Sequence, residues 1–286
     1  MIFRIKQLIL SFLYRLDQLL PRSLGVYVRN RCVPWCLVLD AVELHLADRC
    51  NMNCTGCSHF SPFAAEWYAN PDVVERDLKA LNGKFKGGIR HVNLLGGEPL
   101  LHGDVIGVIK RVRRACPKAI VSMVTNGLML LDEPSEFWQT CRDLRVKINL
   151  TLYPPMYPKR DAIERKCREE GVRLRVLSGD VFFAKMVPDG SANAAKSFQT
   201  CRFTTYCPYL REGHLYRCAQ EYHIADFIEG VGGKGGIVVD DEAVGALDIL
   251  FYLMSPGKVC SYCFEKLRFF PWSRGSSDKA DWCYKK

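Results

Sequence analysis

Strand-like and helix-like segments alternate along the chain between residues 42 and 177. The expected strands are 42–46, 91–95, 119–124, 146–152 and 172–177, and the expected helices are 71–81, 104–115, 133–141 and 159–170. Strict alternation of this kind implies parallel strands joined by right-handed crossovers. We therefore predict an α/β fold, either a barrel or an open parallel sheet. Periodicity alone does not choose between these two.

Chemically unusual turns follow four of the expected strands. They are the cysteine loop 50–57, Gly96-Gly97-Glu98-Pro99, Thr125-Asn126-Gly127 and Tyr153-Pro154-Pro155. In parallel α/β folds the active site forms at the carboxyl ends of the strands. We therefore predict that these turns meet at one rim of the sheet.

The first of these turns carries Cys50, Cys54 and Cys57 in a C-x3-C-x2-C spacing. One short loop can bring three thiolates to a single inorganic centre. A four-iron, four-sulfur (4Fe–4S) cluster takes a ligand on every iron, so three cysteines leave one iron open. The alternatives are a zinc knuckle, for which His59 is the nearest further ligand, and three unrelated buried thiols.

The cysteine triad, followed one strand–helix unit later by Gly96-Gly97-Glu98-Pro99, resembles the signature of the radical S-adenosylmethionine (SAM) enzymes. The resemblance covers roughly residues 40–180 and implies a partial (β/α)6 barrel, similar to a TIM barrel. It also implies that the open iron chelates SAM. One electron then cleaves SAM to a 5′-deoxyadenosyl radical, which abstracts a substrate hydrogen.

The same resemblance implies roles for the residues of the rim. The Gly96, Gly97, Glu98 and Pro99 element would contact the amino group of SAM, because a carboxylate complements an ammonium group. Thr125 and Asn126 would touch the ribose, although an ordinary Asn-Gly turn also explains that sequence. The chain departs from the family pattern at Gly56, where the family usually has an aromatic residue.

A second group of cysteines lies in the carboxy-terminal third. Its members are Cys201, Cys207, Cys218, Cys260 and Cys263. With Gly213 they resemble the auxiliary-cluster modules of the SPASM and twitch type, and the single-cluster twitch form fits best because only Cys283 follows. Cys201, Cys218, Cys260 and Cys263 would hold a second 4Fe–4S cluster, with Cys207 as an alternative to Cys201. Structural zinc is the competing interpretation.

The amino-terminal segment combines apolar residues at helical spacing with basic residues. Its uncharged run, 7–14, is too short to span a bilayer, and no signal-peptide cleavage pattern follows it. Residues 1–30 have two possible interpretations. They form either a helix packed on the domain or a peripheral membrane anchor. The predicted organisation is an amphipathic segment (1–39), a radical SAM core (40–180), a linker (181–200) and a twitch-like module (201–286).

Composition narrows the cellular setting. Fourteen cysteines in 286 residues are clustered rather than spread as a disulfide framework, which favours metal ligation in a reducing compartment. The net charge is +9, but the basic residues are interleaved with acidic ones along most of the chain. Nucleic acid is therefore not the expected partner. We expect the protein to be cytoplasmic. The alternative is that it binds peripherally to the inner membrane surface.

These features predict a radical SAM oxidoreductase or epimerase. The run 57–62, Cys-Ser-His-Phe-Ser-Pro, resembles radical SAM proteins associated with surface-polysaccharide synthesis, which points to a carbohydrate or nucleotide-sugar substrate. A flavodoxin or ferredoxin would supply electrons. Cys207 is a candidate hydrogen-atom donor for epimerisation, with Cys283 as the other candidate. The alternatives are a maturase of a ribosomally made peptide and a zinc-binding interaction scaffold.

Overall fold

The computed structural model describes residues 37–201, 207–231, 235–275 and 278–283. The predicted amphipathic segment therefore lies outside the described residues, except for its last three positions. Leu39, at one of these positions, is buried and forms a parallel bridge with Ile89. Among the helices of the described ranges, none is both long and apolar enough to cross a membrane.

The strands and helices expected between residues 42 and 177 all form, with ends shifted by three residues or fewer. The strands are β1 (Val42–Ala47), β2 (His91–Gly96), β3 (Ile120–Thr125), β4 (Lys147–Leu152), β5 (Leu174–Ser178), β6 (Val181–Met186), β7 (Tyr209–Arg211), β8 (His214–Tyr216), β9 (Ile237–Val238) and β10 (Cys263–Pro271). The α-helices are α3 (Pro71–Lys84), α4 (Val105–Ala115), α5 (Ser135–Asp143), α6 (Arg160–Glu169), α7 (Ala194–Thr200), α8 (Ala219–Phe227) and α9 (Ala246–Met254).

Side chains cap the helices that follow the first strands. Asn70 accepts a hydrogen bond from the Asp72 amide at 2.9 Å, and Pro71 occupies the first turn of α3, where its missing N–H has no helical partner to lose. Asp104 accepts from the Gly107 amide at 2.9 Å and so caps α4. Each cap fixes where the chain leaves a strand-end turn and enters a helix.

The main sheet has the order β5-β4-β3-β2-β1-β7-β8-β9. Strands β1 to β5 pair in parallel, β7 adds a further parallel strand beside β1, and β8 and β9 continue antiparallel. The α/β class with a mostly parallel sheet is thus confirmed. The finer expectation of a partial six-unit barrel stays a prediction.

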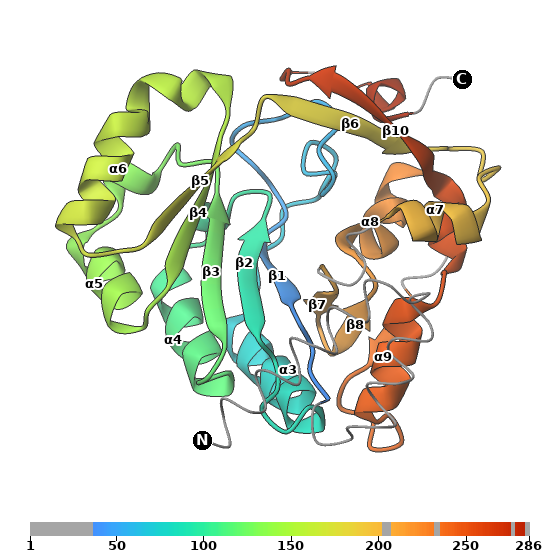
Figure 1. Ribbon diagram of the computed structural model, residues 1–286, viewed down its shortest axis with the longest axis horizontal. Coiled ribbons are helices and arrows are strands. Elements are labelled where there is room, and N and C mark those ends of the chain that lie inside the picture. Colours follow the sequence, from blue (N-terminus) through green and yellow to red (C-terminus); the bar gives the residue numbers. More distant parts are fainter. Residues whose placement is uncertain (1–36, 202–206, 232–234, 276–277, 284–286) are drawn as a thin grey trace, which may run out of the picture.

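Strand β1 shows how the sheet acquires two different faces. Leu44 and Leu46 are buried in the main hydrophobic core, whereas Glu43 and His45 point the other way because side chains alternate along a strand. In Figure 1 the helices α3 to α6 line one side of the parallel strands. We call the side that carries Glu43 and His45 the inner face.

The predicted linker 181–200 is wrong. Residues Val181–Met186 form β6, which pairs antiparallel with β10, and Ala194–Thr200 form α7, capped by Asn193. The polar residues between these elements dominate the composition and conceal the apolar strand before them. Figure 1 shows β6 and β10 running together across the top of the sheet, above the ends of the parallel strands.

A buried carboxylate joins α3 to the turn between β7 and β8. The Gly213 amide donates to Asp77 Oδ2 at 2.6 Å, and Asp77 is only 3% exposed. Arg76 pairs with the other carboxylate oxygen at 2.7 Å. The contact holds the carboxy-terminal hairpin against the first helix of the sheet.

We expect Asp77→Ala to lower the free energy of unfolding by about 1–3 kcal/mol, because it leaves the Gly213 amide buried without an acceptor. Asp72→Ala, on the same helix, is the control, since Asp72 is exposed and pairs with Arg111 at the surface; its effect should stay below about 1 kcal/mol. Urea unfolding measures both. Equal effects for the two variants would contradict a structural role for the Asp77 contact.

Candidate functional site

The turn after β2 packs directly on the start of the cysteine loop. The Gly97 amide donates to the Ala47 carbonyl at 2.8 Å, and the Glu98 amide donates to the Arg49 carbonyl at 3.0 Å. A methyl group at position 97 would collide with the Arg49 backbone, and Gly96 has a φ of +137°. Only glycines allow this approach, so the Gly-Gly pair holds the loop that carries the cysteines.

The described contacts bring N–H donors to two thiols of the loop. Cys50 Sγ accepts from the Met52 amide at 3.4 Å and from Asn126 Nδ2 at 3.6 Å. Cys54 Sγ accepts from the Trp272 indole at 3.1 Å. Burial is the main cause that raises the pKa of Cys50 to about 11 and that of Cys54 to about 12, and the neighbouring thiols contribute.

This donor set fits a metal cluster. Buried thiols of raised pKa stay protonated on their own, and they become thiolates when a cation offsets the charge. The N–H groups directed at sulfur complement that thiolate. Cys57 lies near the same group, since its charge acts on both Cys50 and Cys54.

Glu98 is fully buried and joins two strand-end turns. Its carboxylate accepts from Thr125 Oγ1 at 2.6 Å and from the Asn126 amide at 2.8 Å. Burial raises the pKa of Glu98 to about 7, while these hydrogen bonds act in the opposite direction. Glu98 therefore joins the turns after β2 and β3, and its expected contact with the amino group of SAM stays a prediction.

Thr125 and Asn126 are likewise engaged within the protein. Besides its contact with Cys50, the Asn126 side chain donates to Asn51 Oδ1 at 2.7 Å, and the Thr125 hydroxyl is taken up by Glu98. Pro99 is buried and begins the short 3-10 helix η2 (Pro99–Leu101). These residues tie the ends of β2 and β3 to the cysteine loop, and their expected contacts with SAM stay predictions.

Residues near the end of the chain complete the cysteine loop. Gly56 has a φ of +73°, and a Cβ there would lie 2.5 Å from Phe270 Cζ, so the ring of β10 fills the space beside this glycine. The Trp282 indole donates to the Cys57 carbonyl at 2.9 Å. The tail containing Trp272 and Trp282 thus packs on the first cysteine loop.

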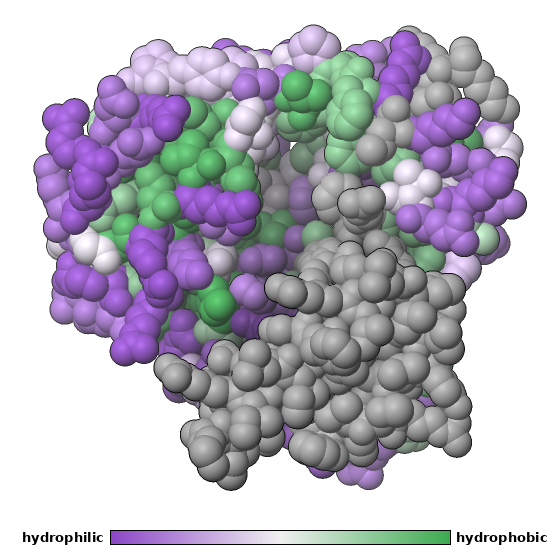
Figure 2. All heavy atoms as spheres, viewed as in Figure 1, coloured by the Kyte–Doolittle hydropathy of each residue, from purple (hydrophilic) through white to green (hydrophobic). Residues whose placement is uncertain are grey.

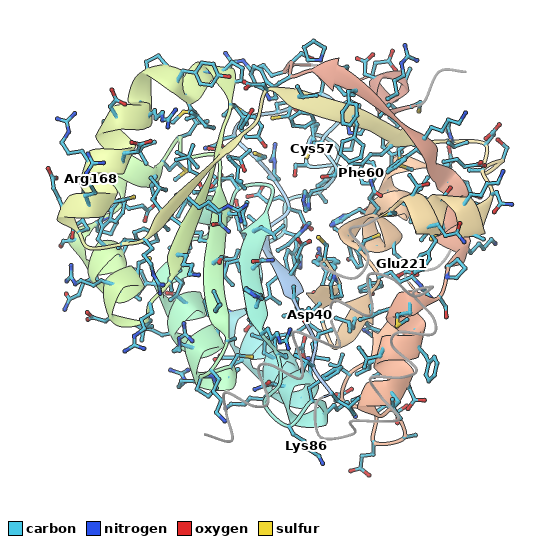
Figure 3. All side chains as sticks on the ribbon, in the orientation of Figure 1. Asp40, Cys57, Phe60, Lys86, Arg168 and Glu221 are labelled. Carbon is cyan, nitrogen blue, oxygen red and sulfur yellow. The ribbon has the colours of Figure 1, made fainter. Side chains whose placement is uncertain are left out.

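Cys57 and Phe60 lie together beneath β6, whereas Arg168 projects from the outer edge of α6 (Figure 3). Phe60 is buried and stacks on Phe227 of α8 at a ring distance of 4.7 Å. An aromatic wall therefore stands between the loop and the carboxy-terminal helices. Its members come from segments far apart in sequence.

The second cysteine group also assembles. Burial, together with the nearby charges of Cys263 and Cys201, raises the pKa of Cys218 well above its usual range. The pKa of Cys263 is raised by burial, by Cys260 and by Cys201. Cys201 follows α7, Cys218 precedes α8, Cys260 lies just before β10 and Cys263 begins it, so these four residues come from neighbouring elements of the carboxy-terminal part.

Cys207 differs from these four because it is bonded to an acid. It hydrogen-bonds the side chain of Glu43 on the inner face of β1, and burial together with this carboxylate raises its pKa. Burial raises the pKa of Glu43 itself to about 7. Burial lowers the pKa of Lys185 on β6, while the charges of cysteines from both groups, Cys57 and Cys201, act in the opposite direction.

Sequence reasoning missed Glu43, Lys185, Phe270 and Trp272 as site residues. A signal existed for two of them, because Glu43 and Lys185 are charged residues within otherwise apolar strands. No signal marked the aromatic residues, whose partners lie about 200 positions away in the sequence.

Comparisons with known proteins agree with this geometry. A family model described as the Radical SAM superfamily matches residues 44–181. A GTP 3′,8-cyclase of Streptomyces coelicolor is 32% identical over 124 residues, which cover 42% of this chain and 36% of the relative. A GTP 3′,8-cyclase of Limosilactobacillus fermentum is 28% identical over 118 residues, covering 41% of this chain and 35% of the relative. The chain thus spans about a third of the length of these curated relatives.

Among solved structures, the crystal structure of BtrN in complex with AdoMet and 2-DOIA shares the fold. Its TM-score is 0.55 at 14% sequence identity, covering 81% of this chain and 99% of that chain. Fold and site together define an α/β protein with a strand-end cysteine loop suited to a metal cluster. The family model covers residues 44–181, a region that contains the cysteine loop and the Gly96–Pro99 turn, and the solved structure shares the fold.

We expect Trp272→Phe to shift the reduction potential of the reconstituted cluster to a more negative value, because it removes an N–H donor from Cys54 while keeping an aromatic ring. Trp138→Phe is the matched control, since that indole bonds the Glu133 carbonyl away from the thiols. A redox titration followed by electron paramagnetic resonance measures the potentials. A shift of the same size in both variants would contradict a specific role for Trp272.

Proposed function

We propose that Cys50, Cys54 and Cys57 bind a 4Fe–4S cluster and that SAM binds beside it at the rim formed by Gly96–Pro99, Thr125 and Asn126. The observation that carries this proposal is the set of N–H donors directed at buried sulfur atoms where β1 ends. When bound, the cluster and SAM supply a 5′-deoxyadenosyl radical. The protein's own residues fix the loop, exclude water from the thiols and present the inner face to a substrate.

We also propose that Cys201, Cys218, Cys260 and Cys263 hold an auxiliary cluster in a twitch-like module. Support comes from the burial of Cys260 and Cys263 and from the electrostatic effect of Cys201 on the other three thiols. Cys207 is the weaker ligand candidate, because its thiol donates to Glu43 and is thereby held protonated. In this assignment the sheet and its crossover helices correspond to the partial barrel that the family resemblance implies.

A row of polar side chains on the inner face favours a polar small-molecule substrate. Glu43 pairs in register with Asn93, Asn93 with Ser122, and Ser122 with Lys147, so these four side chains cross neighbouring strands side by side. Such a row offers both donors and acceptors, which suits a hydroxyl-rich molecule. We therefore propose dehydrogenation or epimerisation of a carbohydrate or nucleotide-sugar-like substrate.

Glu43, Lys185 and Cys207 would serve this reaction between the two cysteine groups. The Glu43 carboxyl, with its pKa near 7, is suited to accept a hydroxyl proton. The Cys207 thiol is suited to return a hydrogen atom in an epimerisation, because it stays protonated beside Glu43. Lys185 supplies a positive charge to an anionic part of the substrate.

The names of the relatives favour a second candidate substrate. Since relatives named GTP 3′,8-cyclase match about two fifths of this chain, a guanine nucleotide is the alternative to a sugar nucleotide. The test is whether reductive cleavage of SAM is stimulated by guanine nucleotides or by sugar nucleotides. Stimulation by only one of the two identifies the substrate class.

We predict about eight irons and a matching amount of sulfide per chain after anaerobic reconstitution. Replacing Cys50, Cys54 and Cys57 together by Ala should leave about four irons and abolish reductive cleavage of SAM, because the remaining cluster has no open iron. Replacing the buried cysteines Cys116 and Cys141 by Ala is the control for general loss of thiols. Zinc without iron or sulfide would instead favour the interaction scaffold.

A matched pair tests the auxiliary ligands. Cys201→Ala should lose about four irons, whereas Cys207→Ala should keep all of them, because Cys207 is bonded to Glu43 and is not a ligand. Iron and sulfide analysis of both variants measures this. Iron loss in Cys207→Ala with retention in Cys201→Ala would reverse the assignment.

A further inference from the structure

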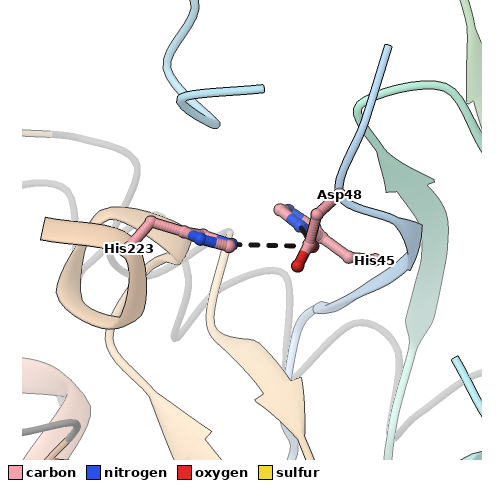
Figure 4. A group of neighbouring side chains, drawn as sticks. All are labelled: His45, Asp48 and His223. Carbon is pink, nitrogen blue, oxygen red and sulfur yellow. Dashed lines mark hydrogen bonds and ion pairs between the residues drawn. The ribbon is translucent and has the colours of Figure 1, made fainter. Parts of the chain in front are cut away.

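The carboxyl end of β1 and helix α8 bring two histidines and a carboxylate together outside both cysteine groups. His45 Nδ1, an Asp48 carboxylate oxygen and His223 Nε2 all lie within 4.8 Å of one another. The three residues are 2%, 5% and 1% exposed. Figure 4 shows His223 approaching from α8 toward Asp48 and His45, which project from β1 and the residues just after it.

His223 has no hydrogen-bond partner among the described residues, although its ring is buried. Both of its ring nitrogens are unsatisfied, and the nearest carboxylate oxygens, of Asp48 and Asp226, lie 3.7 Å and 3.5 Å away. Burying an unpaired polar group is costly, so such a group needs an explanation. The His223 ring stacks on those of His45 and Tyr209, at ring distances of 5.3 Å and 5.9 Å, but stacking does not satisfy its nitrogens.

We propose that His45, Asp48 and His223 form a binding site for a divalent first-row transition ion. Ligand atoms about 2.1 Å from one ion, at angles of roughly 90–120°, lie about 3.0–3.6 Å apart. The separations from Asp48 Oδ1 are 3.0 Å to His45 and 3.7 Å to His223, which suit that spacing. Two histidines and one carboxylate also form a ligand set that such ions prefer.

Each of the three ligands has an outer partner that orients it. His45 Nε2 lies 2.8 Å from His59 Nδ1, Arg211 donates to Asp48 Oδ2 at 2.6 Å, and His223 Nδ1 faces Asp226. Outer partners of this kind fix the imidazole tautomer and aim the ligand atoms at the ion. Arg211 itself stacks between Trp67 and Tyr222, so the carboxylate it holds is fixed in place.

A cavity reaches one of the three residues, His45. A cavity of about 230 Å³ is lined by His45, Trp67 and Arg211. Asp48 is two residues before Cys50, and His223 is five residues after Cys218. An ion bound here would therefore connect the loops that carry the two cysteine groups.

The experiment uses the full chain after anaerobic reconstitution with iron and sulfide, so that the thiols are occupied. Protein is equilibrated with Zn²⁺, and separately with Mn²⁺, and then desalted and analysed for metals. We expect one additional ion per chain in the wild type. His223→Phe, which keeps a ring among the aromatic neighbours, and Asp48→Asn should both lose it.

His214→Phe, in strand β8 of the same region, is the matched control and should keep the additional ion. Asp226→Asn should weaken the affinity for zinc by about 10- to 100-fold, the effect of losing an outer partner. Iron and sulfide contents equal to those of the wild type show that each variant is folded with its clusters. Absence of additional zinc and manganese in the wild type, or equal zinc in His223→Phe and His214→Phe, would overturn the proposal.

The outcome is separable from the proposed function. Iron and sulfide report on the cysteine groups, whereas zinc that depends on His223 reports only on this site. If reconstitution yields no cluster, the same comparison can be made on the chain in which Cys50, Cys54 and Cys57 are replaced by Ala.

Discussion

The backbone contact between the turn after β2 and the turn after β1 is the constraint on which the rest of the site depends. Gly96 and Gly97 lie so close to residues 47–49 that no side chain fits between them, and two amide–carbonyl hydrogen bonds close the contact. Glu98 then extends this rigid pair to β3 through Thr125 and Asn126. The cysteine loop is thereby held by parallel strand ends, whose own positions are set by the core.

The carboxy-terminal part of the chain completes a site that the first part begins. Trp272 donates to Cys54, Trp282 donates to the Cys57 carbonyl, and Phe270 fills the space beside Gly56. This explains in physical terms why an aromatic residue is absent before the third cysteine. At φ +73° and against the Phe270 ring, position 56 has room for glycine only, and the aromatic surface is supplied from β10 instead.

The sequence predicted what depends on local patterns and failed where distant segments meet. Strand and helix periodicity and the strand-end turns placed the rim correctly. The cysteine groups were recognisable because short spacings bring thiols together. By contrast, β6 was hidden by the polar residues after it, and the contacts of Glu98 depend on the register between β2 and β3. The partners of His223 follow from packing between α8 and β1, and no local pattern encodes such packing.

The inner face of β1 carries buried polar side chains that lower the stability of the folded chain. Glu43, His45 and the adjacent Asp48 occupy positions where apolar residues would satisfy a central strand, and burying charges or unpaired imidazoles is unfavourable. Their neighbours Cys207, Lys185, Arg211 and His223 all come from the carboxy-terminal part. Stability alone does not explain why reactive groups from the amino-terminal and carboxy-terminal parts of the chain lie together along one strand. This arrangement is the expected result if the two parts act jointly on a bound molecule, with β1 as the element common to both.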